Sequence, residues 1–382
     1  MADITTKQTG FRVLLQRILT FFGVHSLYSG VLGIVDSTLR SLWIPNWLPA
    51  WCPTSESQLR AAEDRMLRCI EGRLSKQFVD VGNGNQLWTL AVDGSVAADA
   101  PAACHHKTPV VLLHGFGGGV GLWALNLDAL SRGGRSVYAL DLLGFGQSSR
   151  PCFPADAEAA EALFVDAIER WRAQLGLEAM ILLGHNLGGY LAASYALRHP
   201  RRVKHIVLVE PWGFPERPAT SDQNRPVPVW IKALGAVLSP LNPLAGLRMV
   251  GPLGLTLVQT LRPDFKKKFA SMFVDNTVSE YIYHLNVQAP SGETAFKSMT
   301  LPYGWAKRPL LRRLGSLPPD APITLVYGSR SSIDGHSGCG VQEMRRGSHV
   351  EIITIRGAGH YVYADQPDDF NQRVLEVCHQ VD

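Results

Sequence analysis

The sequence lacks any close pair of cysteines. Six cysteines are spread over 382 residues, with no C-x-x-C pair among them: Cys52, Cys69, Cys104, Cys152, Cys339 and Cys378. Zinc sites and disulfide-rich domains need thiols at short, regular spacings, so this distribution argues against both. It fits reduced thiols in the cytoplasm, and we expect no metal site.

The sequence also has little excess of charge of either sign. It has 37 basic and 33 acidic residues, which gives a formal net charge of +4. This excess is too small and too evenly spread to indicate a nucleic-acid-binding protein. Hydrophobic residues make up 46% of the chain and charged residues 18%, which excludes global disorder.

Residues 18–35 contain no Asp, Glu, Lys or Arg, and Lys7, Arg12 and Arg17 precede them. This stretch is at the lower limit for a membrane-spanning helix, which needs about 20 residues. It also contains His25 and several small polar residues. We expect a helix that lies on a membrane surface. A signal peptide or anchor and a helix packed on the globular domain are the alternatives.

A tryptophan recurs at every fourth position in the next segment, at Trp43, Trp47 and Trp51. A proline follows each tryptophan by two residues, and prolines at this spacing are incompatible with a helix. The segment is therefore expected to be extended. Tryptophan is enriched where membrane meets water, so we predict that the three side chains anchor the chain to a lipid surface. The alternative is a tryptophan cluster packed on the core.

The remaining pattern predicts an α/β protein with an inserted lid. Ser55 and Gln58 form a capping-box pattern that begins a lead-in helix. Strand-like runs alternate with helical ones, which indicates a mostly parallel sheet with helices on both faces. The expected strands are 86–92, 110–113, 136–141, 180–183, 205–209, 323–327 and 351–355. The expected segments are an anchor at 1–54, the lead-in helix at 55–77, a core at 78–212 and 305–382, and a mainly helical lid at 213–304.

One motif between a strand and a helix carries most of the functional information. Gly184-x-Asn186-x-Gly188 has the frame of the nucleophile elbow, G-x-S-x-G. Asp334 and His360 follow later strands, as the acid and base of a catalytic triad would. The glycine-rich loop 114–119 matches an oxyanion loop, and we expect the backbone N–H groups of Phe116 and Leu187 to form the hole. This combination resembles the α/β-hydrolase fold.

The nucleophile itself is absent. Asn186 stands where a serine, cysteine or aspartate is needed, and no other Gly-x-Ser-x-Gly occurs in the chain. A carboxamide is not deprotonated by histidine at neutral pH, so it forms no acyl-enzyme. Asparagine does tolerate positive φ, so it keeps the elbow while removing the chemistry. We therefore predict a vestigial triad and no serine-hydrolase activity.

Two groups of cations are candidates for contact with a lipid or a partner. Lys266, Lys267 and Lys268 lie beside phenylalanines in the lid, where they either face anionic headgroups or form an ordinary solvated helix face. Arg330 follows the strand 323–327 on the side where the catalytic loops gather. It is expected either to bind an acidic group of a partner or lipid, or to pair with a neighbouring carboxylate.

Several longer segments resemble the family of alpha/beta-hydrolase domain-containing proteins 4 and 5. The resemblance covers roughly residues 43–382 and is carried by residues 51–55, 114–119, 184–189, 209–218, 302–309 and 359–365. Members with serine at the elbow are lipases for N-acyl phospholipids, and Asn186 separates this chain from them. Before Trp43 the chain departs from the family pattern, because residues 18–35 are longer and more apolar than expected.

The resemblance implies a role in the cytoplasm and on the lipid-droplet surface. It implies a co-activator of adipose triglyceride lipase that also binds a perilipin coat protein and needs no cofactor. A second implication is acyl transfer from acyl-CoA to lysophosphatidic acid, which depends on the H-x4-D pattern of His360 and Asp365. In that chemistry the histidine takes the acceptor's proton and the aspartate orients it. The alternative is that His360 is a remnant of the fold and Asp365 caps the last helix.

Overall fold

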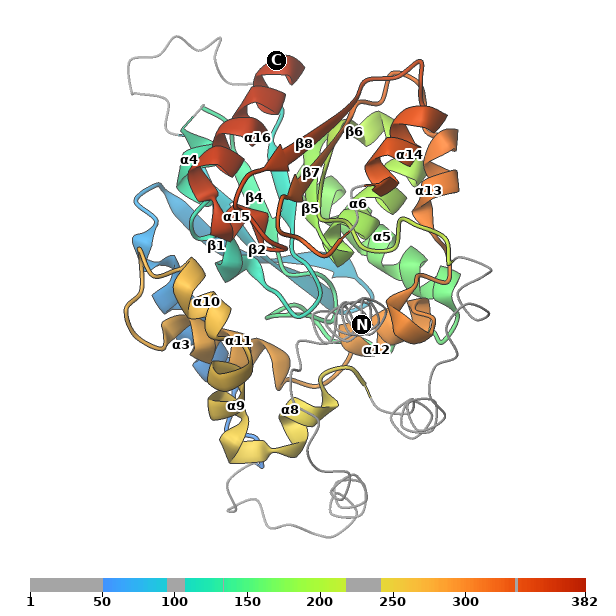
Figure 1. The fold of residues 1–382 in the computed structure, drawn as a ribbon. Helices are drawn as coiled ribbons and strands as arrows, with labels where there is room; N and C mark the ends of the chain where they lie inside the picture. The colour runs from blue at the N-terminus through green and yellow to red at the C-terminus, as the bar shows by residue number, and fades with distance from the viewer. Residues whose placement is uncertain (1–50, 95–106, 133, 218–241, 334–335) are drawn as a thin grey trace, which may run out of the picture.

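The computed structural model describes residues 51–94, 107–132, 134–217, 242–333 and 336–382 (Figure 1). The predicted membrane-surface helix at 18–35 lies outside these ranges. Trp43, Trp47 and Asp334 also lie outside them.

The described residues form one eight-stranded sheet in the order β1-β2-β4-β3-β5-β6-β7-β8. The pairs β1–β2 and β2–β4 are antiparallel, and the other neighbours are parallel. The strands are β1 Leu74–Gly82, β2 Asn85–Val92, β3 Val110–Leu113, β4 Val137–Leu140, β5 Met180–His185, β6 Val203–Val209, β7 Ile323–Gly328 and β8 Val350–Ile355. All seven predicted strands are present, and the mostly parallel sheet is confirmed.

The helices of the described residues fall into two groups, those of the core and those of the lid. The core helices are α3 Glu56–Met66, α4 Leu127–Ser131, α5 Ala157–Gln174, α6 Leu187–Arg198, α13 Leu310–Arg313, α14 His336–Met344, α15 Val362–Asp365 and α16 Pro367–Val381. The lid helices are α8 Ala245–Met249, α9 Gly254–Leu261, α10 Pro263–Lys268, α11 Thr277–Asn286 and α12 Gly292–Met299. None of these helices is long and apolar enough to cross a bilayer.

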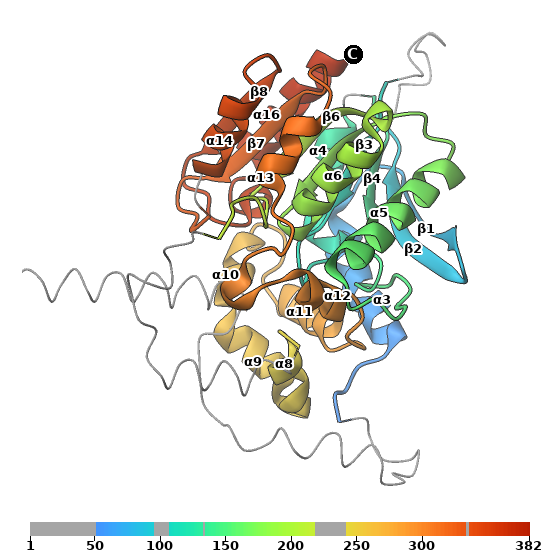
Figure 2. The same cartoon turned by 90° about the vertical axis from the view of Figure 1, so that its right-hand side faces the viewer.

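The central strands are buried on both faces, because helices cover each side of the sheet. On one side, α5 and α6 pack side chains such as Trp171 and Leu191 against the sheet, and Figure 2 shows these helices in front of it. On the other side, α3, α4 and α16 contribute Met66, Leu130 and Phe370 to a second apolar cluster. Helices on both faces were predicted and are confirmed.

The lead-in helix begins as the sequence predicts. Ser55 is the N-cap of α3, and its hydroxyl accepts a hydrogen bond from the backbone N–H of Gln58 at 3.2 Å. This bond satisfies one of the free donors at the helix start. Strand β1, which follows α3, was not predicted.

The lid helices α8 to α11 lie together next to α3, whereas α12 lies apart from them, nearer α5 (Figure 1). Helix α11 packs along α3, and α12 packs along α5. Arg65 of α3 forms an ion pair with Glu280 of α11. The lid therefore contacts both the lead-in helix and the core, close to the carboxyl ends of the strands where the motif residues lie.

Candidate functional site

Asn186 occupies a sharp turn between β5 and α6. Its φ of 51° and ψ of −112° lie outside the ordinary helix and strand regions, as an elbow requires. Its backbone N–H donates to Val209 at 3.0 Å, and its carbonyl accepts from Tyr190 and Trp212 at 3.1 Å each. A side chain at Gly188 would place its Cβ 2.4 Å from the Leu113 carbonyl oxygen, so this position needs glycine. The predicted elbow geometry is therefore present, although the nucleophile is missing.

The side chain of Asn186 accepts a hydrogen bond from one of the two N–H groups expected to form the oxyanion hole. The backbone N–H of Phe116 points to Asn186 Oδ1 at 3.4 Å. Leu187, the other expected donor, is the first residue of α6 and is buried directly after Asn186. The carboxamide oxygen thus lies where the oxygen of a bound ester carbonyl would need the Phe116 donor. Asn186 therefore offers no attacking group, and its carboxamide occupies one of the two N–H groups expected to form the hole.

His114 holds the oxyanion loop in place as a neutral group. It is fully buried, its Nδ1–H donates to the Gly115 carbonyl at 2.8 Å, and its Nε2 accepts from the backbone N–H of Leu142 at 3.0 Å. Burial lowers the pKa of His114 to about 4. The ring is therefore uncharged at neutral pH, and its role here is to position the loop.

His360 contacts a carboxylate that the sequence analysis missed. Its Nδ1 lies 3.4 Å from Oε2 of Glu210, which directly follows β6. Glu210 is fully buried and has a φ of 47°. Its Oε1 accepts from the backbone N–H of Gly328 at 2.7 Å, and its Oε2 also accepts from Ser331 Oγ. The available signal was an acidic residue at the carboxyl end of a buried strand, the same signal that pointed to Asp334.

A second histidine fixes the backbone beside His360. His185 is buried at the end of β5, and its Nε2 donates to the His360 carbonyl at 3.0 Å. The two rings lie with centroids 4.7 Å apart. Burial, followed by the nearby His360, lowers the pKa of His185 well below its usual value, so it is neutral. His185 therefore positions the His360 loop without carrying charge.

Asp365 connects this loop to the lid rather than to the His360 ring. Its Oδ2 accepts from the Gly359 backbone N–H at 2.8 Å, and its Oδ1 forms an ion pair with Lys268. The N-cap of α16 is Gln366, so the expectation that Asp365 caps the last helix is wrong. Any influence of Asp365 on His360 passes through the Gly359 backbone. The orienting role of Asp365 stays a prediction.

The predicted cationic contacts differ in their surroundings. Lys268 is mostly buried in its pair with Asp365, whereas Lys266 and Lys267 are exposed on the same short helix. Arg330 is exposed on the rim, where its guanidinium donates to the Gly357 carbonyl. Its expected ion pair with a carboxylate is not found among the described residues. Its use in binding a partner stays a prediction.

Trp51 lies against the lid with most of its ring exposed. Its indole N–H donates to the Met249 carbonyl at 3.1 Å, and 61% of the residue is accessible to solvent. Gly251 packs on its ring, where an added Cβ would lie 2.6 Å from an indole carbon. Leu253, 68% exposed, lies two residues beyond Gly251. Trp51 is the one predicted anchor tryptophan within the described residues. Its ring is exposed beside the lid, which also exposes Leu253.

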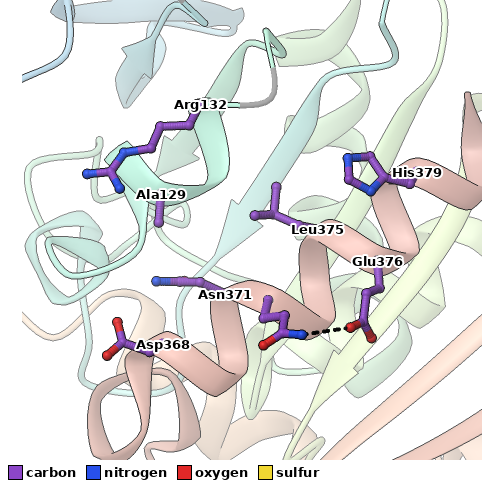
Figure 3. A pocket seen from close by; sticks show the side chains of 8 residues that line it. Ala129, Arg132, Asp368, Asn371, Leu375, Glu376 and His379 are labelled. Atoms are coloured by element: carbon purple, nitrogen blue, oxygen red, sulfur yellow. Dashed lines mark hydrogen bonds between the residues drawn. The ribbon is translucent and has the colours of Figure 1, made fainter.

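A surface cavity of about 430 Å³ lies elsewhere, between α4 and α16 (Figure 3). Arg132 lines it from one side, and Asn371, Leu375, Glu376 and His379 of α16 line it from the other. None of the motif residues lines this cavity. In the described parts of the chain, no group of three or more metal-binding side chains occurs.

Comparison with known proteins agrees with this geometry. The sequence profile described as "alpha/beta hydrolase fold" matches residues 108–367. The chain belongs to the alpha/beta hydrolase fold family. It is similar to a Mus musculus protein named 1-acylglycerol-3-phosphate O-acyltransferase ABHD5, with 62% identity over 91% of this chain and 96% of the relative. The Homo sapiens protein of the same name is 60% identical, with coverage of 91% and 97%. The chain therefore belongs to the ABHD5 group of this family, as predicted.

Two further proteins are less similar to this chain, one in sequence and one in structure. A Bos taurus protein named (Lyso)-N-acylphosphatidylethanolamine lipase is 52% identical over 89% of this chain and 97% of the relative. The crystal structure of naproxen esterase from Bacillus subtilis covers 84% of this chain and 97% of its own, with a TM-score of 0.59 and 20% identity. The esterase supports the fold alone.

Proposed function

We propose that this chain is a non-hydrolytic regulator of triacylglycerol breakdown that stimulates a triglyceride lipase at the lipid-droplet surface. The supporting observation is the position of Asn186, which keeps the elbow but offers no nucleophile and lies on the Phe116 oxyanion donor. A fold that is retained without its nucleophile is suited to binding and to contacts with other proteins. The proposed partners are adipose triglyceride lipase, a perilipin coat protein and the lipid monolayer.

The lipid contact is proposed to use the tryptophan segment together with the lid. Trp51 and Leu253 are both strongly exposed, and Leu253 lies two residues beyond Gly251, which packs on the Trp51 ring. Lys266 and Lys267 add exposed cations suited to anionic headgroups. Arg330, on the rim near His360, is the proposed contact for an acidic group of a partner. The proposed locations are the cytoplasm and the droplet surface.

The experiment measures fatty-acid release from phospholipid-coated triolein droplets. Three samples are compared: this chain alone, purified triglyceride lipase alone, and the two together. The proposal expects no release by the chain alone and faster release by the mixture than by the lipase alone. Release by the chain alone, or an unchanged rate in the mixture, would contradict it.

A second candidate function is acyl transfer from acyl-CoA to the hydroxyl of lysophosphatidic acid. Two observations favour it: the acyltransferase name of the mammalian relatives, and the contact of the partly exposed His360 with Glu210. The test supplies both substrates, with the acyl group labelled, to the wild type and to His360→Ala. Product that forms equally with both proteins would rule out a role for His360 in the reaction.

A further inference from the structure

We propose that Glu210 is the acid partner of His360, and that the two residues form a base that takes a proton from a hydroxyl group bound next to Asn186. Glu210 is then a positioning residue, because it acts on the substrate only through His360. The proposal deepens the second candidate function, acyl transfer to a lipid hydroxyl, and rests on it for the identity of the substrate.

Glu210 is placed as an acid partner has to be. It is fully buried directly after β6, and it keeps a positive φ, which is unusual for a residue with a long side chain. Such strained positions cluster at functional sites. Among the described residues, no lysine or arginine pairs with its carboxylate. Its oxygens are instead held by the Gly328 N–H and the Ser331 hydroxyl, and Oε2 also faces His360 Nδ1 at 3.4 Å.

The contacts around His360 leave its second nitrogen available. His185 fixes the His360 backbone, and Glu210 faces Nδ1. Nε2 makes no hydrogen bond to a described residue, and 20% of the side chain is exposed. A separation of 3.4 Å is long for a hydrogen bond, but catalytic hydrogen bonds commonly tighten only when the substrate is bound. Asp365, the carboxylate of the H-x4-D pattern, is engaged with Lys268 and Gly359.

The chemistry that this base can support is a direct group transfer. With the Nδ1 proton donated to Glu210, the lone pair lies on Nε2. Nε2 takes the proton of the acceptor hydroxyl. At the same time the hydroxyl oxygen attacks the carbonyl carbon of an acyl thioester. The carbon–sulfur bond then breaks, and the thiolate takes the proton back from Nε2, which leaves an ester and a free thiol. The Phe116 N–H becomes available to the thioester carbonyl when the Asn186 carboxamide turns away from it.

The pairing is tested by NMR of the histidine ring protons in the full chain. The His360 Nδ1 proton is identified by the loss of its resonance in His360→Gln. We expect Glu210→Gln to abolish this hydrogen-bonded resonance, while Asp365→Asn and Asp334→Asn retain it. A resonance that persists in folded Glu210→Gln, or that disappears in Asp334→Asn, would overturn the pairing. Thermal unfolding of each variant establishes that it is folded.

A second variant covers the case in which Glu210→Gln does not fold. Ser331→Ala removes the other donor to Oε2, together with the acceptor of the Ile333 backbone N–H. We expect the His360 resonance to shift but to persist in this variant, because His360 becomes the remaining side-chain donor on that oxygen. An unchanged resonance would overturn the proposal.

Acyl transfer to lysophosphatidic acid from labelled acyl-CoA separates the pairing from the function on which it rests. We expect Glu210→Gln to lower the rate by at least about 10-fold and Glu210→Asp to restore part of it. A wild-type rate in folded Glu210→Gln would overturn the positioning role. The wild type could transfer no acyl group while the resonances behave as expected. In that case the acyltransferase function is wrong and the base has no such substrate, but the Glu210–His360 pairing is still supported.

Discussion

The clearest stability prediction concerns two buried carboxyl groups that join the lead-in helix to the core. Glu63 of α3 and Asp141, directly after β4, are both fully buried. Glu63 Oε1 accepts from Trp88 Nε1 at 2.7 Å and from Gln147 Nε2 at 2.8 Å, whereas its Oε2 has no hydrogen-bond partner among the described residues. Asp141 accepts from the backbone N–H groups of Val120 and Gln147. Two carboxylates so placed cannot both be charged without a large cost.

Burial, the largest cause, and the nearby carboxylate of Asp141 together raise the pKa of Glu63 to about 8 from its ordinary value of 4.5. The other titratable or charged groups that face the pair are His114, Arg150, Lys76 and Tyr281. As the pH rises above 4.5, the unfolded chain loses the Glu63 proton while the folded chain keeps it. The free energy of unfolding therefore falls between about pH 4.5 and pH 8 and levels off above that.

The size of the effect follows from the pKa difference. One pKa unit corresponds to about 1.4 kcal/mol, so Glu63 can cost up to about 5 kcal/mol of stability at alkaline pH. The Glu63→Gln variant resembles the protonated acid and has no charge to bury. We expect it to match the wild type near pH 5 and to be more stable by about 2–5 kcal/mol at pH 8.5.

Urea unfolding at pH 5 and pH 8.5 measures this difference. The control is Glu56→Gln, which removes an exposed carboxylate from the same helix and should change the wild-type pH dependence little. The reasoning is refuted if Glu63→Gln is less stable than the wild type at pH 8.5, or if the gap between the two is the same at both pH values.

Three further predictions concern the site and its surroundings. Asn186→Ser alone should give little ester hydrolysis, because catalytic geometry has to hold to within about 0.5 Å; rapid hydrolysis of a nitrophenyl ester by this variant would contradict it. Replacing Trp43, Trp47 and Trp51 by alanine, in a chain shortened to begin near Thr38, should remove the protein from droplets in a flotation assay without unfolding the core. Burial of the three side chains offers on the order of 10 kcal/mol before the cost of ordering them and the loss from partial burial. Retention on droplets would place the anchor elsewhere. Arg330→Glu should lower lipase stimulation while folding stays intact; unchanged stimulation and lipid binding would exclude the proposed contact.

Much of the fold could be predicted because its strands are buried on both faces. Short apolar runs such as β3 Val110–Leu113 have few alternatives, and their order along the chain indicates a parallel sheet. β1 Leu74–Gly82 was missed because it lies at an edge of the sheet. Most of its residues are exposed, so the strand carries a weak apolar pattern. The cap at Ser55 was predictable because capping depends on local residue types alone.

The site was predictable in outline but not in its pairings. The glycines around Asn186 reveal the elbow, since close backbone contacts require them. Which carboxylate faces His360 depends on how three strands lie side by side, and the sequence pattern pointed to Asp334 and Asp365 but not to Glu210. The contact of Asn186 with Phe116 also joins residues 70 positions apart. A pattern of residue types contains no information on such distances.

Labelling with a fluorophosphonate probe tests most directly the claim that the site is non-hydrolytic. The full chain is incubated with the probe, and adducts are located by mass spectrometry, with an active serine esterase as the positive control. We predict no adduct at Asn186 or on any neighbouring side chain of the folded protein, because Asn186 is not a basic nucleophile. A stoichiometric adduct on a residue of this site, abolished by His360→Ala, would contradict it.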